Sequence, residues 1–451
     1  MSSPDTIVAI ASPAGRGAVG IVRVSGPDVP RIACAILGYL PAARLARLAS
    51  FLDGQGNPLD QGLALYFPAP SSFTGEHVLE LHGHGGPLVM DLLVRRALRL
   101  GCRMARPGEF SERAFLNGKI DIAQAEAVAD LIDAGTAAAA RAAVRSMQGE
   151  FSARIALLQS QLTELRAYVE AAIDFPDEEV DFLSAPVIGL RLARLSDGFD
   201  EIMAAAAQGA LLREGLTVVI AGKPNAGKSS LLNRLAGQEV AIVTAAPGTT
   251  RDVLRQHLHL DGLPLNLIDT AGLRDAADAA EAEGIRRARS EMARADRVLY
   301  VLDASRVDAG SQALLAAQLD ELPPGVPVTW VFNKIDLTGA ASRITDAAPV
   351  RVFLSALTGE GIGLLRAHLK ASAGYRDADS GALAARRRHL DALERARALV
   401  LAAALTLRQN HAFELFAEDL RLAQRALGEI TGEFTSEDLL GAIFGSFCIG
   451  K

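Results

Sequence analysis

The sequence predicts a multidomain protein in which α/β domains are combined with a helical domain, and three observations support this fold class. Over the first 118 residues, short β-branched runs alternate with glycine-rich turns. Residues 121–173 and 380–428 are rich in Ala, Leu, Gln, Glu and Arg and contain few helix breakers. Between them, residues 215–373 alternate β-branched runs with helical segments, which is typical of a doubly wound parallel sheet.

Length, charge and cysteine content restrict the class of protein. The 451 residues allow about three domains. With 46 Lys and Arg against 53 Asp and Glu, the net charge of −7 argues against a protein that binds nucleic acid mainly by covering its phosphates, so any RNA contact must be local or shared with a partner. The 3 separated cysteines form no CxxC pair, and no apolar stretch approaches the ~20 residues that span a bilayer. We therefore expect a cytoplasmic protein with no membrane segment.

The N-terminal domain is expected over residues 1–118. Its predicted strands are 7–11, 19–24, 64–67 and 78–81, with one helix at about 88–100. This pattern predicts a compact α/β domain.

The second α/β domain is expected over residues 211–374, between two parts of a helical domain. Its predicted strands are 216–221, 265–268, 298–302, 328–332 and 351–354. The helical parts are residues 119–210 and 375–451, with long helices over most of 121–173 and 380–428. The economical fold is an α/β domain inserted into the helical domain, which is tolerated when the termini of the inserted domain lie close together.

A phosphate-binding loop follows the first strand of that second domain. Residues 222–229 match GxxxxGK[ST] between a strand and a predicted helix, which is the context that makes the motif credible. Its glycines let backbone N–H groups face phosphates, Lys228 supplies a cation to the β and γ oxygens, and the Ser229 hydroxyl can bind Mg²⁺. The loop residues expected to contact the nucleotide are Asn225, Ala226, Gly227, Lys228, Ser229 and Ser230.

Three further segments predict that the nucleotide is GTP. Asp269, Thr270, Ala271 and Gly272 follow a strand and put a carboxylate near the metal and an N–H near the γ-phosphate. Asn333, Lys334 and Asp336 follow another strand, and a carboxylate there accepts two hydrogen bonds from guanine that adenine lacks. The backbone at Ser355 and Ala356 suits the guanine oxygen. The second domain is therefore expected to be a Ras-like P-loop GTPase domain.

Catalysis must be organised differently from that of many signalling GTPases. Leu273 stands where those proteins carry a glutamine that orients water. In the segment 244–252, Thr250 is the residue expected to complete the Mg²⁺ shell only while the γ-phosphate is present. Asn225 can bind a monovalent cation, and acidic residues at 275–283 can hold a water, although a solvated helix start explains most of them as well.

With these motifs in place, the whole chain resembles the family of tRNA-modifying GTPases called MnmE or TrmE. The resemblance rests on nucleotide motifs lying between helical parts, on the C-terminal residues 447–451, and on three N-terminal stretches. Those stretches are DTIVA at 5–9 with GRGAVGIVR at 15–23, SFTGE at 72–76 with ELHGHGG at 80–86, and RPGEFSERAFLNGK at 106–119.

The resemblance implies a reaction and its participants. The N-terminal domain would bind 5,10-methylenetetrahydrofolate or 5-formyltetrahydrofolate as one-carbon donor and form a homodimer. The GTPase domain would also dimerise and be stimulated by K⁺. With the FAD-dependent partner MnmG (GidA), in a heterotetramer, the protein would add a carboxymethylaminomethyl or aminomethyl group to C5 of the wobble uridine of tRNA.

Site residues implied by the resemblance fall into four groups. Arg23, Glu80, Lys119 and Lys451 resemble the folate-binding residues. Ser229 and Thr250 resemble Mg²⁺ ligands, and Asn225, Thr244, Ala246 and Thr249 resemble K⁺ ligands, Ala246 through its carbonyl. Glu281 resembles the glutamate that orients water. The run Ala245-Ala246-Pro247 departs from the family, whose members usually have an acidic or bulky residue and no proline there. The proline removes one N–H and fixes φ, but it leaves the carbonyls available as ligands.

Alternatives to this function come from other classes. A ribosome-assembly or regulatory GTPase would perform no substrate chemistry and would not need Arg23 and Glu80. A folate-dependent transferase with only structural GTP is opposed by the complete switch segment.

Several side chains have competing roles. His82 and His84 could suggest a metal site but lack a third ligand. Cys448 is either a nucleophile or a packing residue, and Arg386 begins a basic run that is either solvated or in contact with tRNA.

Overall fold

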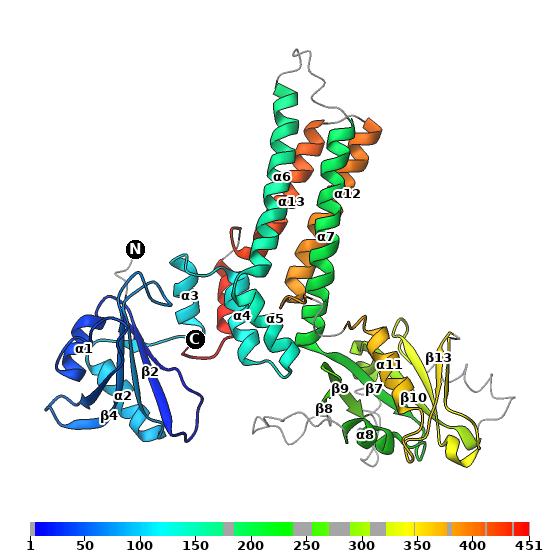
Figure 1. The fold of residues 1–451 in the computed structure, drawn as a ribbon, viewed down its shortest axis with the longest axis horizontal. Coiled ribbons are helices and arrows are strands. Elements are labelled where there is room, and N and C mark those ends of the chain that lie inside the picture. The colour runs from blue at the N-terminus through cyan, green and yellow to red at the C-terminus, as the bar shows by residue number, and fades with distance from the viewer. Residues whose placement is uncertain are drawn as a thin grey trace. The chain divides into compact units, whose positions relative to one another are not determined.

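The computed structural model describes residues 5–174, 185–237, 255–269, 289–306, 322–346, 348–376, 381–410, 413–434 and 437–450. Within these ranges the chain divides into two compact units (Figure 1). The first unit comprises residues 1–129, 146–195 and 392–451, and the second comprises residues 130–145 and 196–391. Each unit is described by itself.

The first unit contains a six-stranded sheet with the order β3-β4-β5-β2-β1-β6. Its strands are β1 (Ile7–Ile10), β2 (Val19–Ser25), β3 (Arg47–Leu52), β4 (Pro58–Phe67), β5 (Val78–His84) and β6 (Arg103–Met104). Helices α1 (Val29–Leu37) and α2 (Pro87–Arg99) cover one face, where Phe51, Leu81 and Leu93 are buried. Alternation turns Ile7 and Ala9 to the other face, where they pack against Phe110 of α3 (Glu109–Leu116).

The four predicted strands of this domain are confirmed, with shifted ends, but strands β3 and β6 and helices α1 and α3 were not predicted. Strand β3 was missed because apolar and polar residues do not alternate in its sequence. Leu48, for example, is apolar but lies on the solvent-facing side and is 64% exposed. Helix α1 was missed because it is short; it begins at a proline and ends at Gly38, whose left-handed φ of +81° terminates it.

The helical region contains more helices than the sequence suggested. It consists of α4 (Ile122–Ile132), α5 (Ala137–Met147), α6 (Glu150–Asp174), α7 (Ala185–Glu214), α12 (Arg387–Asn410), α13 (Phe413–Thr431) and α14 (Glu437–Gly445). The expectation of long helices over most of 121–173 was wrong for its first half. The Thr136 hydroxyl accepts a hydrogen bond from Ala139 N at 3.0 Å and caps the start of α5. Gly149, with φ of +89°, separates α5 from α6.

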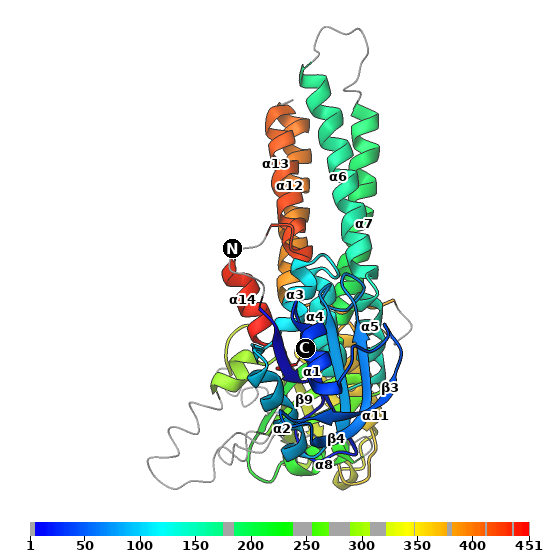
Figure 2. The ribbon, with the colours of Figure 1, turned by 90° about the vertical axis from the view of Figure 1, so that its left-hand side faces the viewer.

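Helices α6 and α13 run side by side, although the second sheet separates them in the sequence, as Figure 1 and Figure 2 show. Arg166 of α6 donates a hydrogen bond to Gln424 of α13 at 2.5 Å. Leu162 and Leu165 on α6 and Leu420 on α13 are fully buried. Burial of these leucines, and not helix propensity alone, stabilises the pair.

The second unit contains a seven-stranded sheet with the order β12-β13-β11-β10-β7-β9-β8. Its strands are β7 (Leu216–Gly222), β8 (Arg255–Leu260), β9 (Leu263–Asp269), β10 (Arg297–Asp303), β11 (Val328–Asn333), β12 (Arg343–Thr345) and β13 (Val350–Phe353). The five predicted strands are confirmed as a parallel core, and the antiparallel edges β8 and β12 were not predicted, since β8 is polar and β12 is short.

Strand β7 lies inside the sheet, with β9 on one side of it and β10 on the other. The carboxyl ends of parallel strands at such a reversal of strand order are where ligands bind in open α/β sheets. Helix α8 (Lys228–Ala236) follows β7 at this point, and α11 (Ile362–Ser372) follows β13. The topology therefore puts the predicted phosphate loop at the expected edge.

Helix α5 belongs to the core of the second unit. Ala138 and Ala142 are buried in one cluster with Leu258, Leu263 and Leu265 of β8 and β9. A bilayer-spanning helix is not found among the described residues.

Candidate functional site

The phosphate loop, residues 222–227, has a backbone that requires glycine at two positions. Gly222 has φ of +139°, and a Cβ there would come within 2.3 Å of Val301 O. Gly227 has φ of +94°, and a Cβ there would come within 2.2 Å of the Asn333 amide nitrogen. Asn225 is also left-handed, with φ of +63°. The loop is thus shaped by local backbone geometry and by its neighbours in the sheet.

Lys228 lies inside this loop and is only 8% exposed. Its Nζ donates hydrogen bonds to Gly222 O at 2.9 Å and to Lys223 O at 3.0 Å. The next two residues, Ser229 and Ser230, are exposed on the first turn of α8. A helix N-terminus with an adjacent ammonium is suited to bind phosphate.

Asp269 is the last residue of β9 and lies opposite Ile220 of β7 in the parallel register. Its carboxylate is therefore beside the strand that leads into the phosphate loop, and it is buried. This is the position predicted for the carboxylate near the metal.

Asn333 joins the phosphate loop to the segment expected to contact guanine. Its side chain is 2% exposed, its amide donates to Ala226 O at 3.0 Å, and its carbonyl oxygen accepts from Ala356 N at 2.9 Å. Ser355 is buried beside it, and its hydroxyl accepts from Thr358 N at 3.2 Å. One buried side chain thus fixes both loops relative to each other.

Lys334 and Asp336 follow Asn333 in the predicted base-recognition segment. Lys334 Nζ donates to Asn225 O at 2.7 Å and to Asp303 Oδ2 at 2.7 Å. Asp336 is exposed within a short 3₁₀ helix, Ile335–Leu337. An exposed carboxylate can exchange its water for the two donors on guanine.

A cavity of about 280 Å³ lies beside the Ala356 segment. It is lined by Ser230, Asn233, Arg234, Gly237, Ala356 and Leu357. Arg234 of α8 donates to Ala356 O at 3.0 Å and to Leu357 O. This arginine, which the sequence motifs did not identify, fixes the segment against α8.

The structure brings together the described residues of the predicted GTP site and leaves others undescribed. The described ones are Asn225, Ala226, Gly227, Lys228, Ser229, Ser230, Asp269, Asn333, Lys334, Asp336, Ser355 and Ala356. Outside the described residues lie Thr244, Ala246, Thr249, Thr250, Thr270, Ala271, Gly272, Glu281 and Lys451.

Sequence reasoning also missed Asp303, although a signal was present. Like Asp269, it directly follows an apolar strand of the parallel core.

A second cluster of predicted residues lies on the N-terminal sheet. Arg23 of β2 and Glu80 of β5 are opposite each other, and Arg23 Nε donates to Glu80 Oε1 at 2.9 Å. His82 Nε2 lies 3.1 Å from Glu80 Oε2. The Arg23 guanidinium lies 5.7 Å from the centroid of the Phe110 ring.

The C-terminal tail reaches this cluster within the same chain. Arg23 Nη1 donates to Gly450 O at 3.3 Å, and Gly108 N donates to Cys448 O at 3.3 Å. Upstream of the tail, Phe444 and Phe447 of the same segment are buried in a cluster with Ile122. The C-terminal segment therefore docks against the N-terminal domain. Lys119 follows α3 in the sequence and is exposed.

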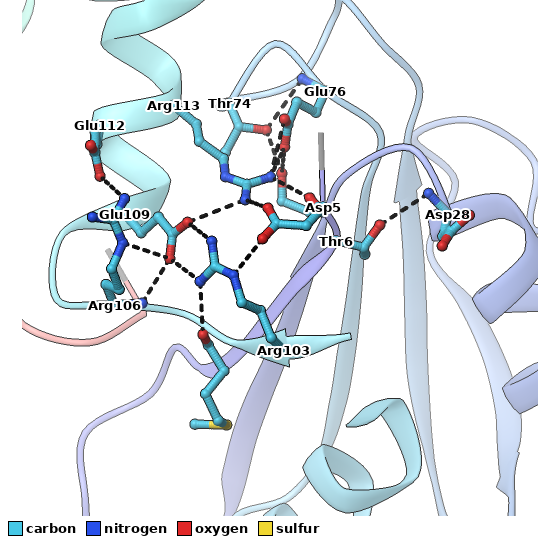
Figure 3. A network of polar contacts seen from close by, with 12 residues as sticks. Asp5, Thr6, Asp28, Thr74, Glu76, Arg103, Arg106, Glu109, Glu112 and Arg113 are labelled. Atoms are coloured by element: carbon cyan, nitrogen blue, oxygen red, sulfur yellow. Dashed lines mark hydrogen bonds and ion pairs between the residues drawn. The ribbon is translucent and has the colours of Figure 1, made fainter. Parts of the chain in front are cut away.

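A polar network fixes α3, the helix that carries Phe110 and follows Gly108 (Figure 3). Glu109 is 3% exposed and lies between Arg103 and Arg113, whose guanidinium groups are 2.5 Å and 3.2 Å from Glu109 Oε1. Arg113 also contacts Asp5 and Glu76. Sequence reasoning missed this network, although its charges recur at helical spacing.

The pKa of Glu109 reflects these neighbours. Burial alone would raise it, but hydrogen bonds from Arg103, from the Arg106 N–H and from Arg113 outweigh burial and hold the pKa at about 2. The carboxylate is charged throughout the neutral range, so the network persists there.

The structure shows the surroundings of the side chains for which the sequence allowed more than one role. His82 contacts Glu80 and His84 contacts Asp60, and the part of the chain that is described contains no group of three metal-binding side chains. Arg386 forms an ion pair with Asp130 at 2.9 Å. Cys448 is exposed.

Comparison with known proteins covers the full chain. A family model described as the GTP-binding protein TrmE N-terminus matches residues 6–119, and the MnmE helical domain matches residues 122–448. The tRNA modification GTPase MnmE of Methylococcus capsulatus is 59% identical over 454 residues, and that of Yersinia pestis is 58% identical, each with 100% of both chains covered.

Among solved structures, the G domain of the T. maritima FeoB iron transporter is 27% identical, with 35% of this chain and 98% of that chain covered and a TM-score of 0.26. The family assignment rests on the family models and the full-length relatives.

Proposed function

The chain belongs to the MnmE, or TrmE, family of tRNA modification GTPases, and from this premise we propose how its two sites serve one reaction. GTP hydrolysis drives the addition of a carboxymethylaminomethyl or aminomethyl group to C5 of the wobble uridine of tRNA. The flavoprotein MnmG (GidA) is the partner, and a reduced folate supplies the one-carbon unit. The observation that carries the GTP part is Asn333, which connects the phosphate loop with the guanine segment.

In the GTP site, the phosphates lie along the loop and Lys228 neutralises their charge. Mg²⁺ binds Ser229 and Thr250, and the exposed Ser229 hydroxyl at the start of α8 is an oxygen ligand of the kind that this ion prefers. The backbone of Thr270, Ala271 and Gly272 contacts the γ-phosphate beside Asp269. Bound Mg²⁺ supplies charge stabilisation.

Potassium is proposed beside the phosphates, with Asn225, Thr244, Ala246 and Thr249 as its ligands. The exposed Asn225 side chain supports this, because its backbone carbonyl is already engaged by Lys334. A monovalent cation there contributes the positive charge that an arginine supplies in other GTPases. Glu281 orients the attacking water.

In the folate site, Glu80 accepts hydrogen bonds from the aminopyrimidine edge of 5,10-methylenetetrahydrofolate or 5-formyltetrahydrofolate. Either Arg23 or the lysines Lys119 and Lys451 meet the glutamate tail. The donor set fits the group, because Glu80 is a half-buried carboxylate with two oxygens that now engage Arg23 and His82 and can be exchanged for ligand donors.

The domain organisation follows from the same premise. Residues 1–118 form the folate-binding and dimerisation domain, 211–374 form the GTPase domain, and 119–210 with 375–451 form the helical domain into which it is inserted. The pairing of α6 with α13 on either side of the second sheet in the sequence supports insertion. The protein acts in the cytoplasm as a homodimer and as a heterotetramer with MnmG.

Mass spectrometry of tRNA nucleosides from a deletion strain tests this function. Wild-type protein should restore the modified wobble uridine, and Glu80→Gln should not, while GTP hydrolysis by the purified variant stays at the wild-type rate. Asp60→Asn is the matched control, since Asp60 pairs with a histidine on the same sheet. Unchanged nucleosides in the deletion strain would refute the proposal and favour a ribosome-assembly or regulatory GTPase.

A further inference from the structure

Asp303, a carboxylate outside the nucleotide motifs, lies in a chain of contacts that links the two halves of the GTP site. It is the last residue of β10, which pairs with β7 on one side and with β11 on the other. Its Oδ2 accepts a hydrogen bond from Lys334 Nζ at 2.7 Å, and the same ammonium donates to Asn225 O at 2.7 Å. One lysine therefore joins the end of β10 to the phosphate loop.

Both residues in the lysine–loop contact have a strained backbone. φ is +63° at Asn225 and +68° at Lys334, the left-handed region that non-glycine residues rarely adopt. Such a conformation is unfavourable for a residue with a Cβ and persists where surrounding contacts impose it. The Lys334 ammonium, held at both the carboxylate and the carbonyl, supplies such a contact for each of them.

The Asp303 carboxylate is itself oriented for this contact. Its Oδ1 accepts hydrogen bonds from Ser305 N at 3.1 Å and from the Ser305 hydroxyl at 2.6 Å. Its Oδ2 faces Lys334 at 2.7 Å and, more distantly, the exposed Arg306 guanidinium at 3.7 Å. Burial raises the pKa of Asp303, but the hydrogen bonds from Lys334 and Ser305 outweigh it and keep the pKa below its usual value. The group is therefore charged at neutral pH.

We propose that Asp303 is a positioning residue for nucleotide binding, which fixes Lys334 and, through it, the phosphate loop at Asn225. It acts without touching GTP: it sets the relative position of the guanine segment and the phosphate loop before the nucleotide arrives. The inference rests on GTP binding at this site and is independent of the folate and potassium chemistry.

The test is Asp303→Asn in the full-length protein, since asparagine keeps the shape and the acceptor for Ser305 but removes the charge. We expect the dissociation rate of a fluorescent GDP and the KM for GTP to rise about tenfold, the order expected for losing a hydrogen bond between charged groups. The kcat should stay within twofold. Asp303→Glu, which keeps the charge, should remain within threefold of wild type in both quantities.

Asp261→Asn is the matched control, because Asp261 pairs with Arg366 at 2.9 Å in the turn between β8 and β9, at the other end of β9 from the phosphate loop. It should leave GDP dissociation and KM unchanged.

A double variant shows whether Asp303 acts through Lys334. Asp303→Asn in a Lys334→Met background should change GDP dissociation less than twofold further. Three outcomes would overturn the proposal. They are a GDP dissociation rate in the double variant that is the product of the two single effects, a dissociation rate in Asp303→Asn equal to that of wild type, and a loss in Asp303→Asn that is confined to kcat. If the wild-type protein binds GDP but does not modify tRNA, only the proposed function is refuted. The role of Asp303 is still decided by the GDP dissociation measurement.

Discussion

Gly108→Ala tests how the C-terminal tail is held at the Arg23 cluster. Gly108 has φ of +66°, and its N–H donates to Cys448 O. A Cβ there would come within 2.4 Å of Phe444 O and 3.0 Å of Phe444 C, which are backbone atoms that cannot rotate away. The variant must therefore shift α3 or α14, in addition to adopting a left-handed backbone.

The destabilisation by Gly108→Ala has two components, the left-handed backbone and the steric overlap of the new Cβ with Phe444. The left-handed conformation of alanine costs about 1 kcal/mol. Overpacking against fixed backbone costs about 1–3 kcal/mol more, whereas complete release of the tail would expose Phe444 and Phe447 at about 1.5–3 kcal/mol each. A shift that breaks the Gly108–Cys448 and Arg23–Gly450 hydrogen bonds is therefore the cheaper response.

Gly38→Ala is the matched control, because φ is +81° and a Cβ there has no atom within 4 Å. Hydrogen exchange should show faster exchange at residues 437–450 in Gly108→Ala than in Gly38→Ala. Calorimetric titration with 5-formyltetrahydrofolate should show affinity at least tenfold weaker than the control. Equal exchange in the two variants would refute the reasoning, since the clash would then be absorbed without moving the tail.

Four further predictions concern the cation, the attacking water, the base and the α3 network. GTP hydrolysis should be faster in K⁺ than in Na⁺ at matched ionic strength, and equal turnover would exclude the potassium site. Glu281→Ala should slow hydrolysis by a factor of order 10² with unchanged GTP affinity, whereas Asp336→Asn should weaken GTP binding and reduce discrimination against xanthine nucleotides; competition binding separates the two. Because the pKa of Glu109 is lowered to about 2, its stabilisation is complete above the unfolded value near 4.5 and is lost as pH falls through 2. Glu109→Gln should thus accelerate exchange in α3 at pH 7, and a variant with wild-type exchange there would contradict this.

Local motifs were predictable because their constraints are local. The turn from β7 into α8 needs glycines and a lysine in a fixed order, so the sequence alone identified Gly222, Gly227 and Lys228. The strands of the parallel core were predictable because both faces are buried, which makes each strand a continuous apolar run.

Other features depend on partners far away in the chain. Asn333 was identified by its motif, but its hydrogen bond to Ala226 O joins residues that are far apart in the sequence. No local sequence pattern predicts such a contact. Arg234 was missed for the same reason, since its importance lies in what it contacts, whereas Asp303 was missed although its place at the end of an apolar strand was a signal. The break at Thr136 was overlooked because a threonine cap resembles an ordinary residue in an alanine-rich run.

Helix α5 has a practical consequence for dissecting this protein. A recombinant fragment cut at residues 211 and 374 would look complete by sequence, yet it would lose Ala138 and Ala142 from its core. Leu258 and Leu263 belong to the same buried cluster, so the fragment would have an incomplete core and a greater tendency to associate. Work on the isolated GTPase therefore needs residues 130–145 supplied as a second piece, and a fragment that aggregates without them reports a missing part of its core and not a defect in its nucleotide site.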